Sequence, residues 1–383
     1  MDIAKIRVKE HIGIVTNETS TTHITFLITP LKNKTTVEKT DYITLDHPTQ
    51  GDTCTIIAEV TEIRSYTETV SATMAEKNTG NLIATAQILG HINQQQQNRP
   101  LQPLLTPLNA GSRVYLPYAE FLEDAFARDA NGKPYQTRIH LGTLEAAATT
   151  AANNEQKKPI RHYLNAETLT ATHTLIAAAD GSGKTHTAAT LTAELANKTQ
   201  HAIAVMDPHN EYAKIKEQTN KPVQTVTPNP DKTIKDPAKT IKPNQIAIAT
   251  AEGLTPEEKH RMFTLYLAAL WKARLEGKVP PFLLVAEDAE ILKNETLEAL
   301  AYEGTKCGVA LVLIAKHPTA LGAAILSQTN TQIMGRTTDK DDLDYLKSMA
   351  LEKAALLPQL RQGEWIVNSA TAARPVKICV RQG

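Results

Sequence analysis

The chain has 383 residues, a length that favours two domains, and its 41 basic and 41 acidic side chains cancel to zero net charge. This balance gives no indication of a protein that coats nucleic acid, although it is compatible with a local basic groove. The three cysteines lie far apart and form no C-x-x-C pair, which argues against a disulfide framework or a structural zinc site.

The amino-terminal part of the chain is predicted to be β-structure. Apolar and polar residues alternate over short segments separated by turn-forming residues, a pattern typical of a small barrel or sandwich. The predicted strands lie within residues 11–30, 40–47, 54–66, 111–118 and 138–144. A polar loop is expected at residues 92–100, and residues 146–159 have no apolar periodicity. We therefore predict an N-terminal all-β barrel domain over residues 1–150, including a linker.

From residue 160 onward the pattern changes to α/β, and residues 151–383 are predicted to form the second domain. Apolar runs that suit buried strands occur at residues 172–179, 201–207, 281–288 and 309–315. Helical segments follow them at residues 188–199, 263–277 and 289–304. This alternation predicts a mostly parallel sheet covered by helices on both faces. The last segment, residues 363–381, predicts two edge strands.

The stretch GSGKT, which begins at Gly181, has the features of a phosphate-binding loop. It follows an apolar strand and precedes a helix whose free N–H groups would face the phosphates. Lys184 can reach the β- and γ-phosphates, and Thr185 can ligate Mg²⁺. The expected nucleotide-binding residues are Asp180, Gly181, Ser182, Gly183, Lys184, Thr185 and His186. Ala178 stands where the loop usually begins with glycine, a change that is costly only if φ is positive there.

A phosphate loop needs an acidic partner at the end of a second apolar strand, and the segment PFLLVAED supplies one. Glu287 is predicted to hold Mg²⁺, and Asp288 to orient the attacking water. Asp288 is one methylene shorter than the glutamate that is usual in such motors, so Asp288→Glu is expected to preserve or raise hydrolysis. Asp207, at the end of the preceding strand, is the alternative acidic partner.

Together these motifs resemble the HerA-like DNA translocases of the FtsK–HerA group of P-loop ATPases, over nearly the whole chain. The run MDPHNEY is similar to a family run usually written Asp-Pro-His-Gly-Glu-Tyr. The segment LSQTNTQIMGRTTDKDD is similar to a Leu-Ser-Gln-x-Asn-Thr-Gln-Ile run followed by arginine and a downstream aspartate. The β segments resemble the N-terminal barrel of the family, with residues 113–122 and 139–144 as its closing segments.

The resemblance implies a RecA-like ATPase domain in a homo-hexameric ring that encircles double-stranded DNA and moves along it by hydrolysing ATP with Mg²⁺. The nucleotide would lie between subunits, and the neighbouring subunit would supply a positive charge. In archaea such rings usually work with the nuclease NurA at broken DNA ends, feeding resection for recombination. A NurA-type nuclease is therefore the implied partner.

Several departures from the family pattern cluster at the expected chemistry. Glu290 stands where histidine is common, and Thr305 where the group usually has the arginine of a trans finger. Lys316 stands where the group usually has a glutamine that senses the γ-phosphate. Loss of the finger predicts slow hydrolysis unless another cation replaces it. The candidate catalytic cations are Lys306, Lys316 and Arg336.

Two other features have a structural interpretation that is favoured over a functional one. His209 and Glu211 lack a third partner at metal spacing, so a loop that flanks the nucleotide is favoured, with Glu211 contacting water or a neighbouring subunit. The segment 213–244 carries seven lysines against three acidic residues. It could follow DNA phosphates, but a solvated loop is favoured.

Two classes of function are compatible with these observations. The favoured one is an ATP-driven DNA translocase whose DNA-stimulated hydrolysis depends on Lys184. The alternative is a nucleotide-binding ring or scaffold with weak or no hydrolysis, and a motor for plasmid transfer or defence is a further alternative. The amino terminus lacks the apolar core of a signal peptide, and the longest apolar run, residues 307–315, is too short to span a bilayer. We therefore expect a cytoplasmic protein without membrane contact.

Overall fold

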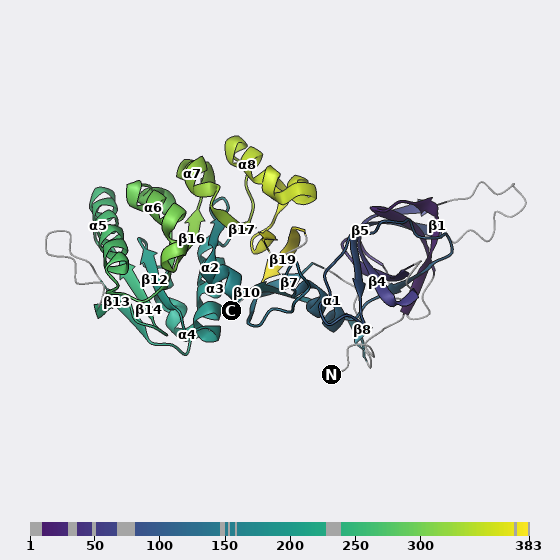
Figure 1. The fold of residues 1–383 in the computed structure, drawn as a ribbon. Helices are drawn as coiled ribbons and strands as arrows, with labels where there is room; N and C mark the ends of the chain where they lie inside the picture. Colours follow the sequence, from purple (N-terminus) through teal and green to yellow (C-terminus); the bar gives the residue numbers. More distant parts are fainter. Residues whose placement is uncertain are drawn as a thin grey trace, which may run out of the picture. The chain divides into compact units, whose positions relative to one another are not determined.

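A computed structural model describes most of the chain (Figure 1). The described residues are 10–29, 37–47, 51–66, 81–145, 150–151, 154–157, 159–226, 239–370 and 374–381. Much of the predicted linker, residues 146–159, lies outside this set. So do residues 227–238, the middle of the lysine-rich segment. The described part of the linker includes a two-stranded sheet of β8 (Thr150–Ala151) and β9 (Asn154–Lys157).

Contacts divide the chain into two compact units that exchange short segments near the predicted boundary. The first unit comprises Met1–Pro134 and Thr143–His162, and the second Tyr135–Gly142 and Tyr163–Gly383. A single boundary at residue 150 therefore does not describe how the chain is divided. The exchange arises because one strand that we expected to close the barrel joins the sheet of the second unit.

The first unit contains a closed barrel, as the sequence pattern predicted. Its strands follow the order β1-β2-β5-β4-β3-β6, and neighbouring strands are antiparallel. Their bounds are β1 (Glu10–Thr19), β2 (His23–Ile28), β3 (Tyr42–His47), β4 (Gly51–Tyr66), β5 (Asn81–Asn93) and β6 (Arg113–Leu116), and α1 (Ala119–Phe126) follows. Alternate side chains such as Ile24, Phe26 and Ile56 point inward and form the barrel core.

The second unit is built on an 11-stranded sheet with the order β10-β7-β19-β18-β17-β11-β16-β15-β12-β14-β13. The bounds of its strands are β7 (Arg138–Leu144), β10 (Arg161–Asn165), β11 (His173–Ala177), β12 (Ala202–Asp207), β13 (Val223–Val226), β14 (Ile246–Thr250), β15 (Phe282–Ala286), β16 (Val309–Ala315), β17 (Thr329–Met334), β18 (Glu364–Ser369) and β19 (Val376–Val380). The pairs from β17 to β13 are parallel. The pairs β17–β18 and β18–β19 are antiparallel. The predicted mostly parallel sheet is therefore confirmed.

Two placements predicted from the sequence are wrong. The strand within residues 138–144 does not close the barrel, because β7 lies beside β19 in the large sheet. Gly142 permits this neighbour, since a Cβ atom at that position would overlap the backbone of Cys379. The strands β18 and β19 are not edge strands, because β7 and β10 extend the sheet beyond them.

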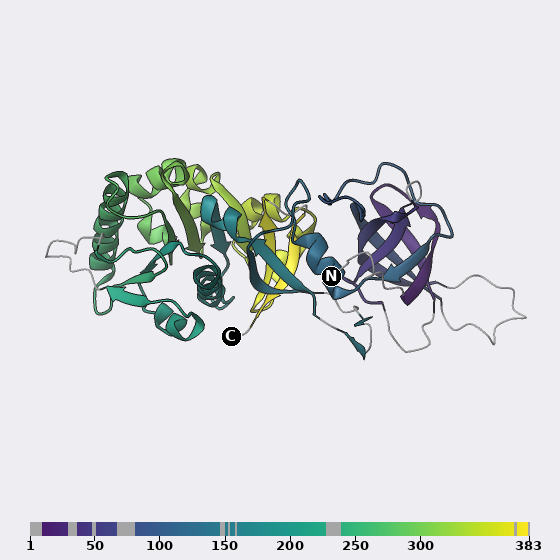
Figure 2. The ribbon, with the colours of Figure 1, turned by 60° about the horizontal axis from the view of Figure 1, so that its bottom comes forward.

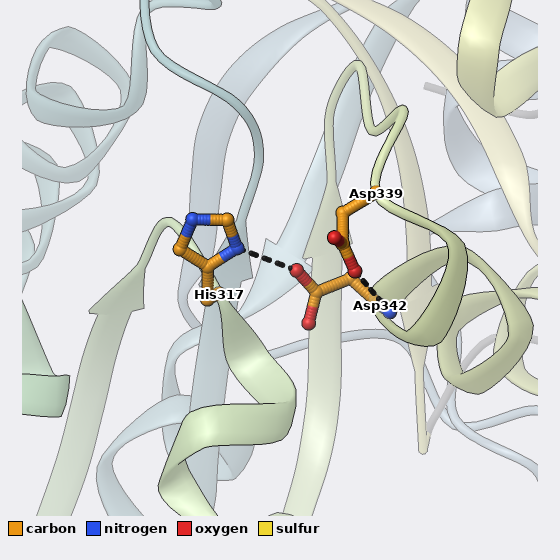
Figure 3. A group of neighbouring side chains, drawn as sticks. All are labelled: His317, Asp339 and Asp342. Atoms are coloured by element: carbon orange, nitrogen blue, oxygen red, sulfur yellow. Dashed lines mark hydrogen bonds and ion pairs between the residues drawn. The ribbon is translucent and has the colours of Figure 1, made fainter.

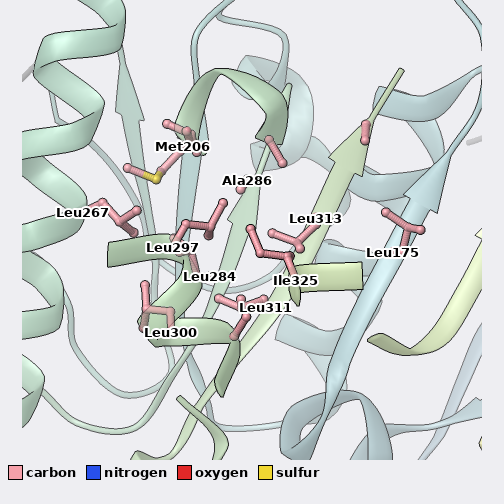
Figure 4. Packing of buried hydrophobic residues seen from close by; sticks show 14 of the residues in the cluster. Leu175, Met206, Leu267, Leu284, Ala286, Leu297, Leu300, Leu311, Leu313 and Ile325 are labelled. Carbon is pink, nitrogen blue, oxygen red and sulfur yellow. The ribbon is translucent and has the colours of Figure 1, made fainter. Parts of the chain in front are cut away.

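Helices cover both faces of the large sheet (Figures 1 and 2). One face carries α5 (Pro256–Leu275), α6 (Glu295–Glu303), α7 (Ala323–Leu326) and α8 (Lys340–Ala350), and the other carries α3 (Lys184–Lys198) and α4 (Ile215–Gln218). The short α2 (Ala166–Ala171) precedes β11. Figure 4 shows the core beneath the first group, where Leu267, Leu297 and Ile325 pack on the strands.

The helix predicted at residues 289–304 is divided in the structure. A 3-10 turn, η4 (Ala289–Leu292), comes first, and α6 starts afresh at Asn294, whose side chain accepts a hydrogen bond from the N–H of Leu297. The helix predicted at residues 263–277 is confirmed and begins earlier, because Thr255 and Glu258 form a capping box. Among the described helices, none combines the length and the apolar character that a membrane span requires.

Candidate nucleotide-binding site

Five parallel strands of the second unit end at the same edge of the sheet, and the predicted site residues follow these ends. The strand β11 leads into the phosphate loop, residues 178–185, and β15 leads into the acidic pair. The strands β12, β16 and β17 lead into residues 207–212, Lys316 and Arg336, respectively. Open α/β sheets bind their ligands outside the carboxyl ends of the strands, so this edge is the candidate site.

The phosphate loop has the backbone expected from its glycines. Gly181 and Gly183 have φ angles of 75° and 95°, which L-residues rarely adopt, and Gly183 caps the amino end of α3. Ala178 is not among the described non-glycine residues with positive φ. It is fully buried, and a Cβ atom added to Gly335 would lie 2.7 Å from its Cβ atom. Alanine at position 178 is therefore unstrained, and a neighbouring glycine provides the space for it.

Glu287 is a buried carboxylate held by two hydroxyl groups. Its side chain is 2% exposed. Tyr212 donates a hydrogen bond of 2.8 Å to Oε2, and Thr185 Oγ1 lies 3.1 Å from Oε1, with its single proton shared between Glu287 and Glu211. Burial raises the pKa of Glu287 to about 7, although both hydrogen bonds act in the opposite direction. A hydroxyl brings no positive charge, so this site is chemically suited to a cation that would stabilise the ionised carboxylate.

Glu211 belongs to the same site, in line with the interpretation that its loop flanks the nucleotide. Thr185 Oγ1 lies 2.8 Å from Glu211 Oε2, so Glu211 contacts the phosphate loop of its own chain. We had expected it to contact water or a neighbouring subunit. Thr185, Glu211 and Glu287 together supply oxygen ligands of the type that Mg²⁺ prefers.

Asp207 shapes the loop that carries Glu211. Its buried carboxylate accepts hydrogen bonds from the backbone N–H groups of His209, Glu211 and Tyr212, at 3.3, 3.0 and 2.9 Å. Asn210 has a φ angle of 59° and occupies the glycine position of the family run, which asparagine tolerates better than most residues. The carboxylate of Asp207 is thus used within its own loop, which disfavours the alternative in which it is the acidic partner.

Asp288 is held by a histidine from the same loop. His209 Nε2 lies 2.6 Å from Asp288 Oδ2, and the two side chains are 46% and 31% exposed. The backbone of Asp288 is left-handed, with a φ angle of 48°, a conformation in which aspartate is enriched. The left-handed turn places its carboxylate beside the loop after β12. His209 therefore holds the carboxylate of Asp288, in addition to its structural role within its own loop.

The two lysines of the site converge on one aspartate. Lys184 Nζ is 3.2 Å from Asp180 Oδ1, and Lys316 Nζ is 2.5 Å from Asp180 Oδ2. The hydrogen bonds from Lys316 and then from Lys184 lower the pKa of Asp180, and Asp180 raises the pKa of Lys316. Lys316 is therefore adjacent to the phosphate loop.

Lys306 lies apart from this centre, whereas His186 and Arg336 border it through contacts with backbone groups. Lys306 lies in η5 (Thr305–Cys307), ahead of the amino end of β16 and so at the opposite edge of the sheet. His186 Nε2 donates a hydrogen bond of 2.9 Å to the carbonyl of Arg381, at the end of β19. Arg336 accepts a hydrogen bond of 2.8 Å from the N–H of Ala179 through its backbone carbonyl, and its side chain is exposed.

Two contacts beside the phosphate loop have no counterpart in the sequence motifs. The N–H of Gly363, in the turn before β18, donates a hydrogen bond of 3.1 Å to the carbonyl of Ser182. Glu290 Oε1 accepts a hydrogen bond of 2.7 Å from the N–H of His317, which ties the residue after Lys316 to the end of β15. Both contacts restrain the strand ends that form the site.

His317, Asp339 and Asp342 form a further cluster at this edge (Figure 3). One ligand atom from each lies within 4.8 Å of the others. His317 Nδ1 is 2.9 Å from Asp342 Oδ2, while Asp342 Oδ1 accepts hydrogen bonds from Thr319. Asp339 accepts the N–H groups of Asp341 and Asp342 and so caps α8. These bonds give the cluster a structural role that joins the end of β16 to α8.

Comparison with known proteins places these features in one family. The family model described as "Helicase HerA, central domain" matches residues 139–353, which is more than half of the chain. This range includes the phosphate loop, the loop after β12, the acidic pair and Lys316. The barrel of the first unit lies outside it.

Curated relatives are similar over part of the chain. A probable helicase of Methanocaldococcus jannaschii is 27% identical over 164 residues, which cover 37% of this chain and 32% of the relative. The DNA double-strand break repair helicase HerA of Sulfolobus acidocaldarius is 26% identical over 167 residues, covering 39% and 34%. The protein of the same name from Pyrococcus furiosus is 34% identical over 84 residues, covering 19% and 15%. The matches span about a third or less of the relatives' own length.

Solved structures give weaker likenesses. VirB4 of Thermoanaerobacter pseudethanolicus matches with a TM-score of 0.49 and 11% identity, covering 65% of this chain and 97% of that chain. The genome packaging NTPase B204 from Sulfolobus turreted icosahedral virus 2 matches with a TM-score of 0.39 and 14% identity, covering 54% and 96%.

Proposed function

Because the chain belongs to the HerA helicase family, whose central-domain model matches residues 139–353, we propose that it is an ATP-driven translocase of double-stranded DNA. The observation that carries this proposal is the meeting of Lys184, Thr185 and Glu287 at one edge of the sheet. The last two approach to 3.1 Å although they are 102 residues apart in the sequence. This convergence of a phosphate loop and a buried acid is what nucleotide hydrolysis requires.

The residues divide the work as follows. The N–H groups of the loop, residues 180–186, and Lys184 bind the phosphates. Thr185 and Glu287 would hold Mg²⁺, with Glu211 beside them, and the ion would neutralise charge on the phosphates. Asp288 orients the attacking water and accepts its proton, and His209 positions Asp288. Tyr212 positions Glu287.

In this proposal, the positive charge that stabilises the transferred phosphoryl group comes from the same subunit or from its neighbour. Lys316 acts within the subunit, since it lies beside the phosphate loop. Lys306 lies at the opposite edge of the sheet, so it acts only on the site of a neighbouring subunit, as in a ring of six copies. Arg336 borders the phosphate loop of its own chain and is the third candidate. A NurA-type nuclease and DNA end resection complete the proposed context.

The first test is steady-state ATP hydrolysis by the full chain, with and without linear duplex DNA. The variant Lys184→Ala removes the β/γ-phosphate contact and is expected to lose nearly all turnover. Lys198→Ala is the matched control, because Lys198 is an exposed lysine at the far end of the same helix. If Lys184→Ala hydrolyses ATP as fast as Lys198→Ala, the assignment of the nucleotide site is refuted. If duplex DNA does not change the rate of hydrolysis by the wild type, the assignment as a translocase is refuted.

A nucleotide-binding scaffold is the second candidate, and one observation favours it. Asp180 engages both Lys184 and Lys316, so the lysine of the phosphate loop and the lysine beside it are already paired with a carboxylate. Slow hydrolysis follows if this pairing persists with nucleotide bound. ATP binding without turnover, in the presence of duplex DNA, would favour the scaffold.

A further inference from the structure

Asp180 brings a negative charge into a loop whose expected ligand is also negative. Its carboxylate accepts hydrogen bonds from two lysines, one through each oxygen atom, at 3.2 Å from Lys184 and 2.5 Å from Lys316. The side chain of Lys184 is 9% exposed, and that of Lys316 is 45% exposed. The partly buried Lys184 is the cation that a phosphate loop directs at the β- and γ-phosphates.

The two lysines meet because of the sheet order, since they are far apart in the sequence. Lys184 follows β11 and Lys316 follows β16, and these strands are parallel neighbours. Two ammonium groups that converge on one point repel each other unless an anion is bound by both. A triphosphate is such an anion, and Asp180 offers the same kind of oxygen ligands from within the loop.

We propose that Asp180 is an internal competitor of the nucleotide phosphates, and that a nucleoside triphosphate binds by displacing its carboxylate from Lys184 and Lys316. The inference rests on the proposed function, because it places the nucleotide at the phosphate loop. The side chain of Asp180 is 68% exposed, so its carboxylate can turn into solvent without disturbing the core. The sequence assignment of Asp180 as a nucleotide-binding residue is thereby replaced by competition with the nucleotide.

The competition discriminates between nucleoside triphosphates and diphosphates. A diphosphate reaches Lys184, whereas Lys316, on the neighbouring strand end, meets the γ-phosphate. A diphosphate therefore displaces Asp180 from one lysine, and a triphosphate displaces it from both. Loss of the Asp180 charge also makes the site more positive by one unit, which makes nucleotide binding more sensitive to salt.

The variant Asp180→Asn tests the competition. Binding of AMPPNP, a non-hydrolysable triphosphate, and of ADP is measured with Mg²⁺ by calorimetry on the full chain, at two salt concentrations. We expect the Kd to fall about tenfold for AMPPNP and about threefold for ADP, as for the loss of two and of one exposed ion pair. The salt dependence of AMPPNP binding is expected to steepen.

Two further variants separate competition from a general charge effect. Asp344→Asn removes an exposed aspartate that pairs with Lys347 on α8, at 3.0 Å, and is expected to leave both Kd values unchanged. In a Lys316→Gln background, Asp180→Asn is expected to strengthen AMPPNP binding only about threefold, because one of the two ion pairs is already absent.

The outcomes distinguish this inference from the proposed function. If the wild type binds AMPPNP and Asp180→Asn binds it equally or more weakly, the competition is refuted and the nucleotide site stands. An equal gain for AMPPNP and ADP refutes the release of Lys316 by the γ-phosphate. If neither protein binds AMPPNP although both melt at the same temperature, the nucleotide site and the proposed function fail together.

Discussion

The hydroxyl of Tyr212 donates a hydrogen bond of 2.8 Å to Oε2 of Glu287, and both side chains are buried. Burial, followed by the nearby charge of Glu287, raises the pKa of Tyr212 well above its usual value, so the phenol stays protonated and remains the donor. The bond occupies Oε2 and leaves Oε1 facing Thr185. Tyr212 thus orients the carboxylate toward the phosphate loop.

Tyr212→Phe keeps the ring in the core and removes this hydrogen bond. The loss of a donor to a buried carboxylate costs about 1–3 kcal/mol. We expect a loss of this size in the transition state for hydrolysis, and kcat for ATP therefore falls about tenfold or more. Steady-state kinetics and a thermal melt are measured together, with Tyr302→Phe, an exposed tyrosine of α6, as the control. An unchanged kcat in the folded Tyr212→Phe protein would show that Thr185 is sufficient to orient Glu287 and that Tyr212 is not needed.

The backbone of Asp288 changes the expectation for Asp288→Glu. Its left-handed conformation suits aspartate better than glutamate, and a longer side chain cannot keep the 2.6 Å contact with His209 Nε2. A backbone penalty of about 1 kcal/mol and the lost contact predict lower turnover rather than the higher turnover that reach alone suggests. The measurement is kcat for the variant. A rate at or above that of the wild type would show that the longer reach of the glutamate carboxylate outweighs the backbone penalty and the lost contact with His209.

Asp288→Asn separates chemistry from positioning. Asparagine keeps the left-handed backbone but cannot accept a proton, so turnover is expected to fall about a hundredfold while AMPPNP binding is unchanged. His209→Ala should lower kcat less, with little change in KM, because His209 acts through Asp288. Equal AMPPNP binding in all three proteins is the control, and full turnover in Asp288→Asn would remove Asp288 from the mechanism.

Ala178→Gly restores the glycine usual at the start of the loop and is expected to bring no benefit. Ala178 packs beside Gly335 without positive φ, so glycine adds only flexibility and a small void. We expect the free energy of unfolding to fall by about 1 kcal/mol and the Kd for AMPPNP to stay the same. Urea unfolding and calorimetry check both values, and tighter binding would show that the loop needs the freedom of glycine.

His173 makes the stability of the second unit depend on pH. Its ring accepts the N–H of Leu311 at 3.1 Å and lies 3.0 Å from the carbonyl of Ala301. Burial lowers its pKa below the ordinary 6.5, against the smaller effect of the Ala301 carbonyl. The unfolded chain therefore takes up a proton below pH 6.5 that the folded chain excludes, and this contribution to stability, complete above pH 6.5, is lost as the pH falls.

Urea unfolding between pH 7.5 and pH 5 measures this loss. Trp271 and Trp365 are the two tryptophans of the chain and both belong to the second unit, so their fluorescence reports on that unit. In His173→Asn, which does not titrate, the free energy of unfolding should fall less steeply with pH. Parallel slopes for the two proteins would assign the pH dependence to other groups.

Local pattern was sufficient for the parts of the protein that depend on neighbouring residues. The phosphate loop, the apolar runs at β15 and β16 and the alternation of the barrel strands were all predicted, because strand and helix periodicity and the φ freedom of Gly181 and Gly183 are properties of short segments. The family resemblance followed from the same short motifs. The order of strands was not predicted, and neither was the place of β7 and β19 inside the large sheet.

The contacts that define the site were decided by the tertiary structure. Tyr212 reaches Glu287 across 75 residues, and Lys316 meets Asp180 only because β16 pairs with β11. A sequence motif reveals which residues follow a strand, but the proximity of two strand ends depends on which strands are neighbours in the sheet. The amino-acid sequence by itself thus determined the phosphate loop and the acidic pair. The folded sheet determined that Glu211 and Tyr212 join them and that an aspartate pairs with both lysines.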